Sequence, residues 1–188
     1  MILDPTYGFN VVNMVTRDDC QDFAGIYANL NGDILHNPSR SQVRKLLVAH
    51  PERPLILSGH GTPRGLLNKD WNDYVVGSEL VQFLHKQQCI IGVFCYASNF
   101  ADKYNLHGFF TSMFISNVSE SVDEGFPSTH ESIQKENILF SKKLNNLILN
   151  EPNMSSWPSK LQEYGLNHKE PFVRFNYEAM AFYEKENR

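Results

Sequence analysis

The sequence predicts an α/β fold in which a mostly parallel sheet is flanked by helices on both faces. Two short apolar runs without helical periodicity, 55–58 and 89–94, have the composition of buried parallel strands. Around them lie segments whose apolar residues recur at helical spacing. Strands that alternate with helices in this way form βαβ units, and 188 residues suffice for one such domain over 1–188.

Six segments are predicted to be strands because they are apolar or β-branched and are bounded by turn residues. They are residues 9–15, 34–36, 55–58, 89–94, 109–116 and 172–183. The last of these alternates apolar and polar residues, although a helix from Glu178 also fits its pattern.

Six further segments are predicted to be helices: 18–30, 40–49, 75–86, 98–104, 132–149 and 158–164. The clearest start is at Ser39, which together with Gln42 has the spacing of a capping box. The polar segments 68–73, 117–127 and 150–157 are expected to be loops.

Composition limits the classes of partner. The net charge is −4 and there is no run of Lys and Arg, so nothing in the charge favours binding to nucleic acid. No apolar stretch approaches the ~20 residues of a membrane span, and the N-terminal segment does not resemble a secretory leader. The three cysteines show no disulfide pattern. We therefore expect a cytoplasmic protein without membrane partners.

Each of the two central apolar runs ends in a residue that can carry out chemistry. His60 follows the first and Cys95 follows the second, and the chain between them accommodates one loop and one crossover helix. Reactive groups collect at the carboxyl ends of parallel strands. A thiol beside an imidazole is the core of a cysteine-nucleophile site, and the N–H of Gly61 could bind an oxyanion. The plainer alternatives are a core Cys and a hydrogen-bonded His.

A family resemblance is carried by two stretches, NPSRSQVRKLLVAHPERPLILSGHGTPRGLL and CIIGVFCYAS. They resemble the caspase-like cysteine peptidases of clan CD, and within these the CHAT-domain group is the most similar. The resemblance implies a caspase-like three-layer sandwich without a cofactor. It assigns the general base to His60, the nucleophile to Cys95 and the oxyanion site to Gly61.

The resemblance has limits. The caspase signature Gln-Ala-Cys-x-Gly is absent, because Phe94 and Tyr96 flank the Cys here. In the family, the loop after the next strand helps to form the specificity pocket. Candidate substrate-binding residues are Asp102, Ser116, Glu120 and Asp123. Since they include three carboxylates, we expect cleavage after Arg or Lys rather than after Asp.

Other functions remain open. His36, His60, His107 and Cys95 are a candidate zinc-ligand set, but no CxxC or HxxxH spacing supports it, and we expect no metal. An α/β hydrolase would need a G-x-S-x-G motif, which is missing. The first hypothesis is a cysteine endopeptidase that acts on a protein or peptide substrate and that an activating protein partner could switch on. The alternative is a catalytically silent module that binds a protein partner or ligand.

Overall fold

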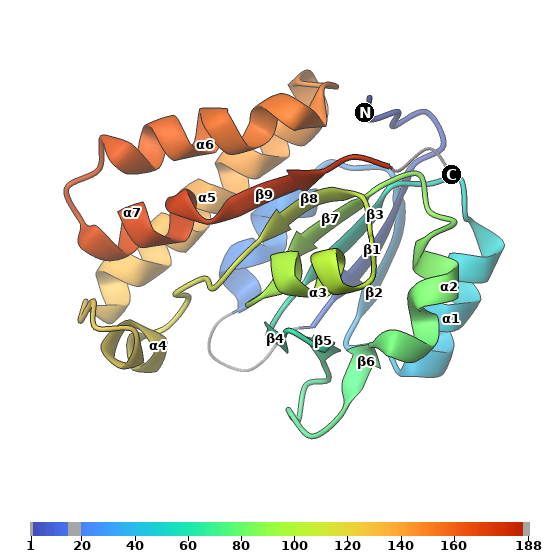
Figure 1. The fold of residues 1–188 in the computed structure, drawn as a ribbon, viewed down its shortest axis with the longest axis horizontal. Helices are drawn as coiled ribbons and strands as arrows, with labels where there is room; N and C mark the ends of the chain where they lie inside the picture. Colours follow the sequence, from blue (N-terminus) through green and yellow to red (C-terminus); the bar gives the residue numbers. More distant parts are fainter. Residues whose placement is uncertain (1, 15–19, 186–188) are drawn as a thin grey trace.

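The computed structural model describes residues 2–14 and 20–185 and shows a three-layer α/β sandwich built on a six-stranded sheet (Figure 1). The strand order is β2-β1-β3-β7-β8-β9, so β3 and β7 lie at the centre. The strands are β1 (Phe9–Asn13), β2 (Gly32–His36), β3 (Leu55–Ser58), β7 (Ile90–Val93), β8 (Gly108–Thr111) and β9 (Met180–Tyr183). Neighbouring strands are parallel except β9, which is antiparallel to β8.

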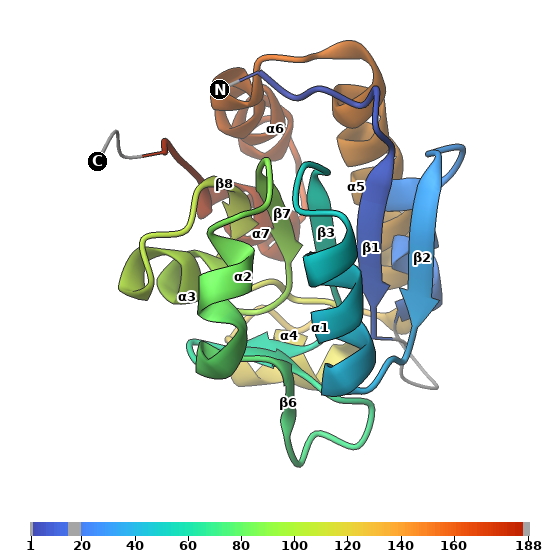
Figure 2. The same ribbon diagram turned by 90° about the vertical axis from the view of Figure 1, so that its right-hand side faces the viewer.

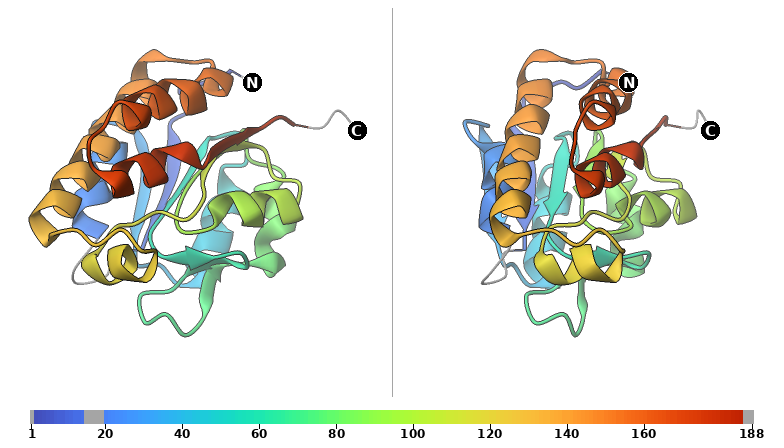
Figure 3. Two further views of the ribbon diagram at one scale, coloured as in Figure 1. Left: turned by 60° about the vertical axis from the view of Figure 1, so that its left-hand side comes forward. Right: turned by 90° about the vertical axis from the view of Figure 1, so that its left-hand side faces the viewer.

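Each face of the sheet is covered by its own layer of helices. One layer consists of α1 (Arg40–Ala49), α2 (Val81–Leu84) and α3 (Ala97–Lys103) (Figure 2). The other consists of α5 (His130–Asn150), α6 (Trp157–Leu166), α7 (Pro171–Glu178) and a 3-10 helix (Cys20–Tyr27) (Figure 3). Successive strand side chains point to opposite faces, so Leu55 and Leu57 pack in the first layer and Ile56 in the second.

A second, smaller sheet lies beyond the carboxyl ends of the central strands (Figure 1). It is antiparallel and consists of β4 (Gly61–Thr62), β5 (Gly65–Leu67) and β6 (Tyr74–Val76). The short helix α4 (Val118–Asp123) lies at the same end of the molecule. Both elements therefore border the region to which β3 and β7 deliver His60 and Cys95.

Helix α1 has the bounds that the sequence predicts. The Ser39 side chain accepts a hydrogen bond from the Gln42 N–H, and the Gln42 side chain bonds back to the Ser39 N–H, which forms the capping box. The longest helix is α5, whose 21 residues bury only one side. Within the described part of the chain, no helix combines the length and the apolar character needed to cross a membrane.

The C-terminal segment corrects the prediction of a strand over 172–183. Residues 171–178 form α7, and only Met180–Tyr183 is a strand. The buried residues of α7 are Phe172, Val173, Asn176 and Tyr177, which lie on one face of a helix. Pro171 is tolerated because it occupies the first turn, where its missing N–H costs nothing.

Three other segments also differ from expectation. The predicted helix 75–86 begins as strand β6, and Gly77 separates that strand from a 3-10 turn and the short α2. The predicted loop 117–127 contains α4. The expected helix 18–30 is in part a 3-10 helix, and its first two residues lie outside the described residues.

The predicted strand 109–116 is shorter than expected, because β8 ends at Thr111. Beyond it, the Asn176 side chain accepts from the Ile115 N–H at 2.7 Å and donates to the Ile115 carbonyl at 3.0 Å. A side chain of α7 thus satisfies backbone groups that a strand would satisfy through its ladder. Residues 112–116 therefore need no strand partner, and they run past the carboxyl ends of the strands next to Cys95.

Candidate active site

His60 and Cys95 each lie two residues beyond the end of a central strand. β3 and β7 are parallel neighbours, and Ser58 at the end of β3 is paired with Val93 at the end of β7. Equivalent positions after paired residues reach the same edge of the sheet, so the two side chains arrive together. This placement is the one that the sequence predicts. Their chemical roles stay a prediction.

Gly59 turns the chain between β3 and His60. Its φ of +143° lies in a region that side-chain-bearing residues rarely adopt. A Cβ at this position would also lie 2.7 Å from the Cβ of Met14 and 2.9 Å from its carbonyl oxygen. Only glycine satisfies both constraints, and the resulting turn directs the imidazole away from the sheet.

The turn after Cys95 is held by the neighbouring strand β8. Tyr96 has a φ of +62°, a left-handed conformation that costs a non-glycine residue roughly 1–3 kcal/mol. Its N–H donates to the Ser112 carbonyl at 3.1 Å, and the Thr111 hydroxyl donates to the Phe94 carbonyl at 3.0 Å. These two bonds stabilise the strained turn and fix where the Cys95 side chain projects.

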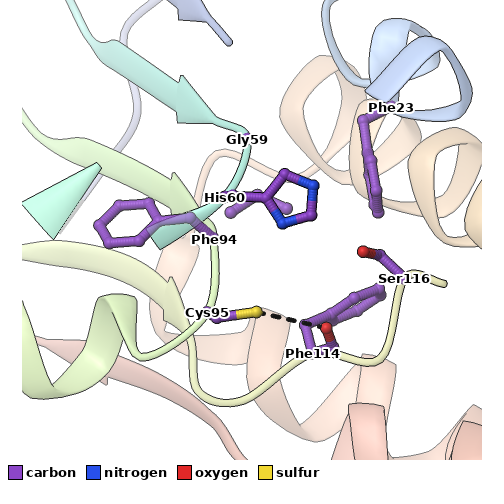
Figure 4. Close-up of a pocket in the computed structure, with 8 residues that line it drawn as sticks. Phe23, Gly59, His60, Phe94, Cys95, Phe114 and Ser116 are labelled. Atoms are coloured by element: carbon purple, nitrogen blue, oxygen red, sulfur yellow. Dashed lines mark hydrogen bonds between the residues drawn. The ribbon is translucent and has the colours of Figure 1, made fainter. Parts of the chain in front are cut away.

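Both side chains line one small pocket (Figure 4). Its walls are Phe23, Gly59, His60, Val93, Phe94, Cys95, Phe114 and Ser116. The volume is about 10 Å³, which is room for about one water molecule. His60 and Cys95 are both buried. A peptide therefore needs the pocket to open before its carbonyl carbon can reach the thiol.

Glu120, on the first turn of α4, contacts both His60 and Cys95. Its Oε1 lies 3.6 Å from Nδ1 of His60 and 3.9 Å from Sγ of Cys95. Its Oε2 accepts hydrogen bonds from the Ser116 N–H at 2.7 Å and from the Ser116 hydroxyl at 2.9 Å. Ser116 and Glu120, both predicted to bind substrate, are thus brought to the pocket.

The Cys95 thiol faces two oxygen atoms. It donates to the Phe114 carbonyl at 3.4 Å, drawn as a dashed line in Figure 4, and to the Glu120 carboxylate. Both contacts favour the protonated thiol, because an oxygen acceptor and a negative charge each oppose formation of a thiolate. The geometry therefore holds the sulfur in its less nucleophilic form.

Trp71 covers the outer side of His60. The centres of the two rings are 4.5 Å apart and their planes are tilted by 47°. The indole is 54% exposed and comes from the loop between β5 and β6. It shields the imidazole from water on that side.

Gly61 is required for packing. A Cβ on this residue would lie 2.2 Å from the Cδ2 atom of the Phe94 ring. Gly61 belongs to β4, where it is paired with Leu66. It is not one of the residues that line the pocket in the described part of the chain. The proposed contact between its N–H and an oxyanion therefore stays a prediction.

The structure does not bring Asp102 and Asp123 to the pocket. Asp102 is exposed on α3 and lines a separate surface hollow with Asn105 and Tyr183. Asp123 is exposed at the C-terminal end of α4, three residues beyond Glu120. Each residue lies near the C-terminal end of its helix, several residues along from the segment that reaches the strand ends.

The histidines of the candidate zinc set are dispersed. His36 ends β2, on the far side of β1 from β3, and contacts Asn13. His107 precedes β8 and its Nε2 lies 3.0 Å from the Gln88 carbonyl oxygen. Within residues 2–14 and 20–185, no group of three or more His, Cys, Asp or Glu side chains could hold a metal ion.

Cys89 has a different environment from Cys95. It is fully buried immediately before β7, and burial raises the pKa of its thiol to about 12. A thiol in this state is inert at neutral pH. The contrast matters for labelling experiments, because Cys89 supplies an internal reference for a purely structural cysteine.

The sequence does not predict that Trp71, Phe23 and Phe114 lie at the site, and it predicts a loop at Glu120. One local signal was available: Asn117 and Glu120 have the spacing of a helix N-cap and its third residue. In the structure, the Asn117 side chain accepts from the Glu120 N–H at 2.9 Å. No local signal places Trp71 against His60, since that contact depends on how the small sheet folds back.

Comparison with known proteins adds no assignment. No protein-family model matches this chain, and no curated protein or solved structure matches it significantly.

Proposed function

We propose that this chain is a cysteine peptidase of the caspase-like type, with Cys95 as nucleophile and His60 as general base and acid. The observation that carries the proposal is the arrival of both side chains in one pocket from the carboxyl ends of adjacent parallel strands. This is the placement that the resemblance of the two sequence stretches requires. The strained turn at Tyr96 adds support, since such strain concentrates at functional sites.

The proposed reaction has two stages. His60 takes the thiol proton, the sulfur attacks the peptide carbonyl carbon, and the C–N bond breaks as the imidazolium returns the proton to the leaving nitrogen. Water, deprotonated by His60, then cleaves the thioester to give a carboxylic acid and the free thiol. The N–H groups of Gly61 and Cys95 are proposed to bind the oxyanion.

The proposed preference for Arg or Lys before the cleaved bond depends on Glu120. Of the four predicted substrate-binding residues, Ser116 lines the pocket, and Glu120, which carries the charge, contacts the lining residues His60 and Cys95. No Lys or Arg lines the described pocket, so nothing there favours an Asp side chain. In a peptide-library assay, we expect E120Q to lose this preference and D102N to keep it. Cleavage after Asp would contradict the proposal.

A second candidate function is a catalytically silent module that binds a protein or ligand. The observation that favours it is the small size of the pocket, in which the thiol is bonded to the Phe114 carbonyl and no substrate side chain fits. The same small pocket is expected of a peptidase that an activating protein must open. The two candidates differ in the reactivity of Cys95.

Labelling with a thiol-directed peptide probe at neutral pH, read by mass spectrometry, tests the proposal. A peptidase is expected to label at Cys95 far faster than at Cys20 or Cys89. The label should vanish in C95A and slow by about 10²-fold or more in H60Q. Labelling of Cys95 no faster than that of Cys89, with or without candidate activating proteins, would instead support the silent module.

A further inference from the structure

We propose that Glu120 is a positioning residue that holds an additional proton on the Cys95–His60 pair and thereby sets the pH range in which the pair is active. The inference deepens the proposed function and rests on the pairing of these two residues. It concerns a residue outside the pair, and it makes a prediction about proton uptake that does not require peptide cleavage.

The carboxylate is held in place by its surroundings. The N–H and hydroxyl of Ser116 both donate to Oε2, and the Asn117 side chain caps the helix turn that carries Glu120. The Asn137 side chain of α5 in turn donates to the Ser116 carbonyl at 2.9 Å. Glu120 is thus anchored from α4, from the segment after β8 and from α5, with its Oε1 directed at the pair.

The electrostatic consequence follows from the two short distances. At 3.6 Å, a carboxylate stabilises the protonated imidazole of His60. At 3.9 Å, the same oxygen repels a thiolate on Cys95. Both effects oppose loss of a proton. The thiol and the imidazolium therefore each give up their proton at a higher pH than they would without Glu120.

Other charges near the pair are weaker candidates for this role. Glu124 lies on the same helical segment, and partial burial together with the charges of Glu124 and Cys95 raises the pKa of Tyr96. Tyr96 follows Cys95 directly but is neutral near pH 7. The remaining described walls from the 3-10 helix, β7 and the segment after β8 are uncharged. Among the described side chains, Glu120 contacts both members of the pair.

A purely structural Glu120 and a charge-setting Glu120 predict different pH profiles. Loss of a structural support lowers the reactivity of Cys95 at every pH and leaves the titration midpoints where they are. Loss of the charge moves both midpoints in the same direction, toward acid. Because the two groups are coupled, the midpoints belong to the pair and must both be measured.

The experiment measures the two midpoints separately in the full chain. The rate of Cys95 alkylation by iodoacetamide against pH reports the thiol. Trp71 fluorescence against pH is expected to report His60, because a protonated imidazole quenches a neighbouring indole, while the buried Trp157 gives a constant background. The variants are E120Q, the exposed matched control D123N from the same helix, and E120D, which retains the charge.

We expect E120Q to move both midpoints toward acid by about one to three pH units. D123N should move neither by more than a few tenths, and E120D should restore part of the shift. Midpoints that stay in place in E120Q, that move in opposite directions, or that move equally in D123N would overturn the inference. Failure of Cys95 to cleave peptides while both midpoints move would remove the peptidase proposal and leave this inference standing.

Discussion

At the scale of single residues, the backbone of the site depends on conformations that few side chains tolerate. Gly59, which precedes His60, adopts a positive φ that residues with a side chain rarely adopt. Tyr96, which follows Cys95, adopts a left-handed φ although it is not glycine. Both turns are supported by neighbouring strands, so the strain is balanced by the sheet and does not depend on the pocket being occupied.

Replacement of Cys95 by Ala tests the nucleophile. We expect C95A to abolish any peptidase activity and to lower the free energy of unfolding by about 1 kcal/mol, well below the ~2–5 kcal/mol of a large core truncation. The reason is that the side chain is small and lines a pocket. Activity and urea denaturation are the measurements, with C89A as the matched control. Full activity in C95A would assign the nucleophile elsewhere.

Replacement of Gly61 by Ala tests its packing role. The added methyl group would meet the Phe94 ring at 2.2 Å, so we expect a loss of about 1–3 kcal/mol in the free energy of unfolding. A smaller residue at position 94 relieves the clash. The double variant G61A/F94L should therefore be less destabilised than the sum of the single variants, as a double-mutant cycle would measure. Strict additivity would contradict the proposed clash.

At the scale of secondary-structure elements, helix α4 is the part that completes the site. Its six residues are too few for a stable isolated helix, so its cap and its packing hold it. The Asn117 side chain supplies the cap, and Ser121 is the residue that it buries. A change in α4 therefore acts on the pocket through the position of Glu120.

Removal of the α4 cap should change the reactivity of Cys95, an effect that a loss of stability by itself would not produce. We expect N117A to lower the free energy of unfolding by about 1 kcal/mol and to change the reactivity of Cys95. T129A is the control, because Thr129 caps α5 through the Ser132 N–H and lies outside the pocket lining. It should cost a similar amount of stability and leave Cys95 reactivity unchanged. If N117A and T129A changed the reactivity of Cys95 equally, the proposed role of α4 in positioning the site would be contradicted.

At the scale of the whole molecule, the two hydrophobic layers keep β3 and β7 in register. One core packs the sheet against α5, α6, α7 and the 3-10 helix, and the other packs it against α1, α2 and α3. Burial on both faces specifies the register, because a shift of one residue would exchange the two faces of each strand. The pairing of Ser58 with Val93, and with it the meeting of His60 and Cys95, follows from this packing.

The stability of the whole molecule should fall in mild acid through His107. Burial is the main cause that lowers the pKa of this residue. An unfolded histidine titrates near 6.5, so below that pH the unfolded chain binds more protons than the folded one, and the free energy of unfolding decreases as pH falls. We expect H107Q to weaken this decrease between pH 7.5 and 5, as measured by urea denaturation. The exposed control H130Q should leave the decrease intact.

The sequence by itself determined the elements whose signals are local. Helix α1 begins where Ser39 and Gln42 form a capping box, and strand β3 covers the apolar run that ends before Gly59. The secondary structure predicted from the sequence is wrong where tertiary packing competes with the intrinsic propensity of the residues. The aromatic residues of 172–178 suit a strand by type, yet they form α7 because Phe172, Val173 and Tyr177 then share one buried face.

The tertiary structure alone decided which further side chains lie beside His60 and Cys95. Chain order and strand periodicity predict that His60 and Cys95 come together, since parallel strands end at one edge of a sheet. They do not predict that Trp71 lies against His60 or that Glu120 turns inward while Asp102 and Asp123 face solvent. Those outcomes depend on how the small sheet and α4 pack on the strand ends, and contacts between segments distant in the chain leave no periodic trace in the sequence.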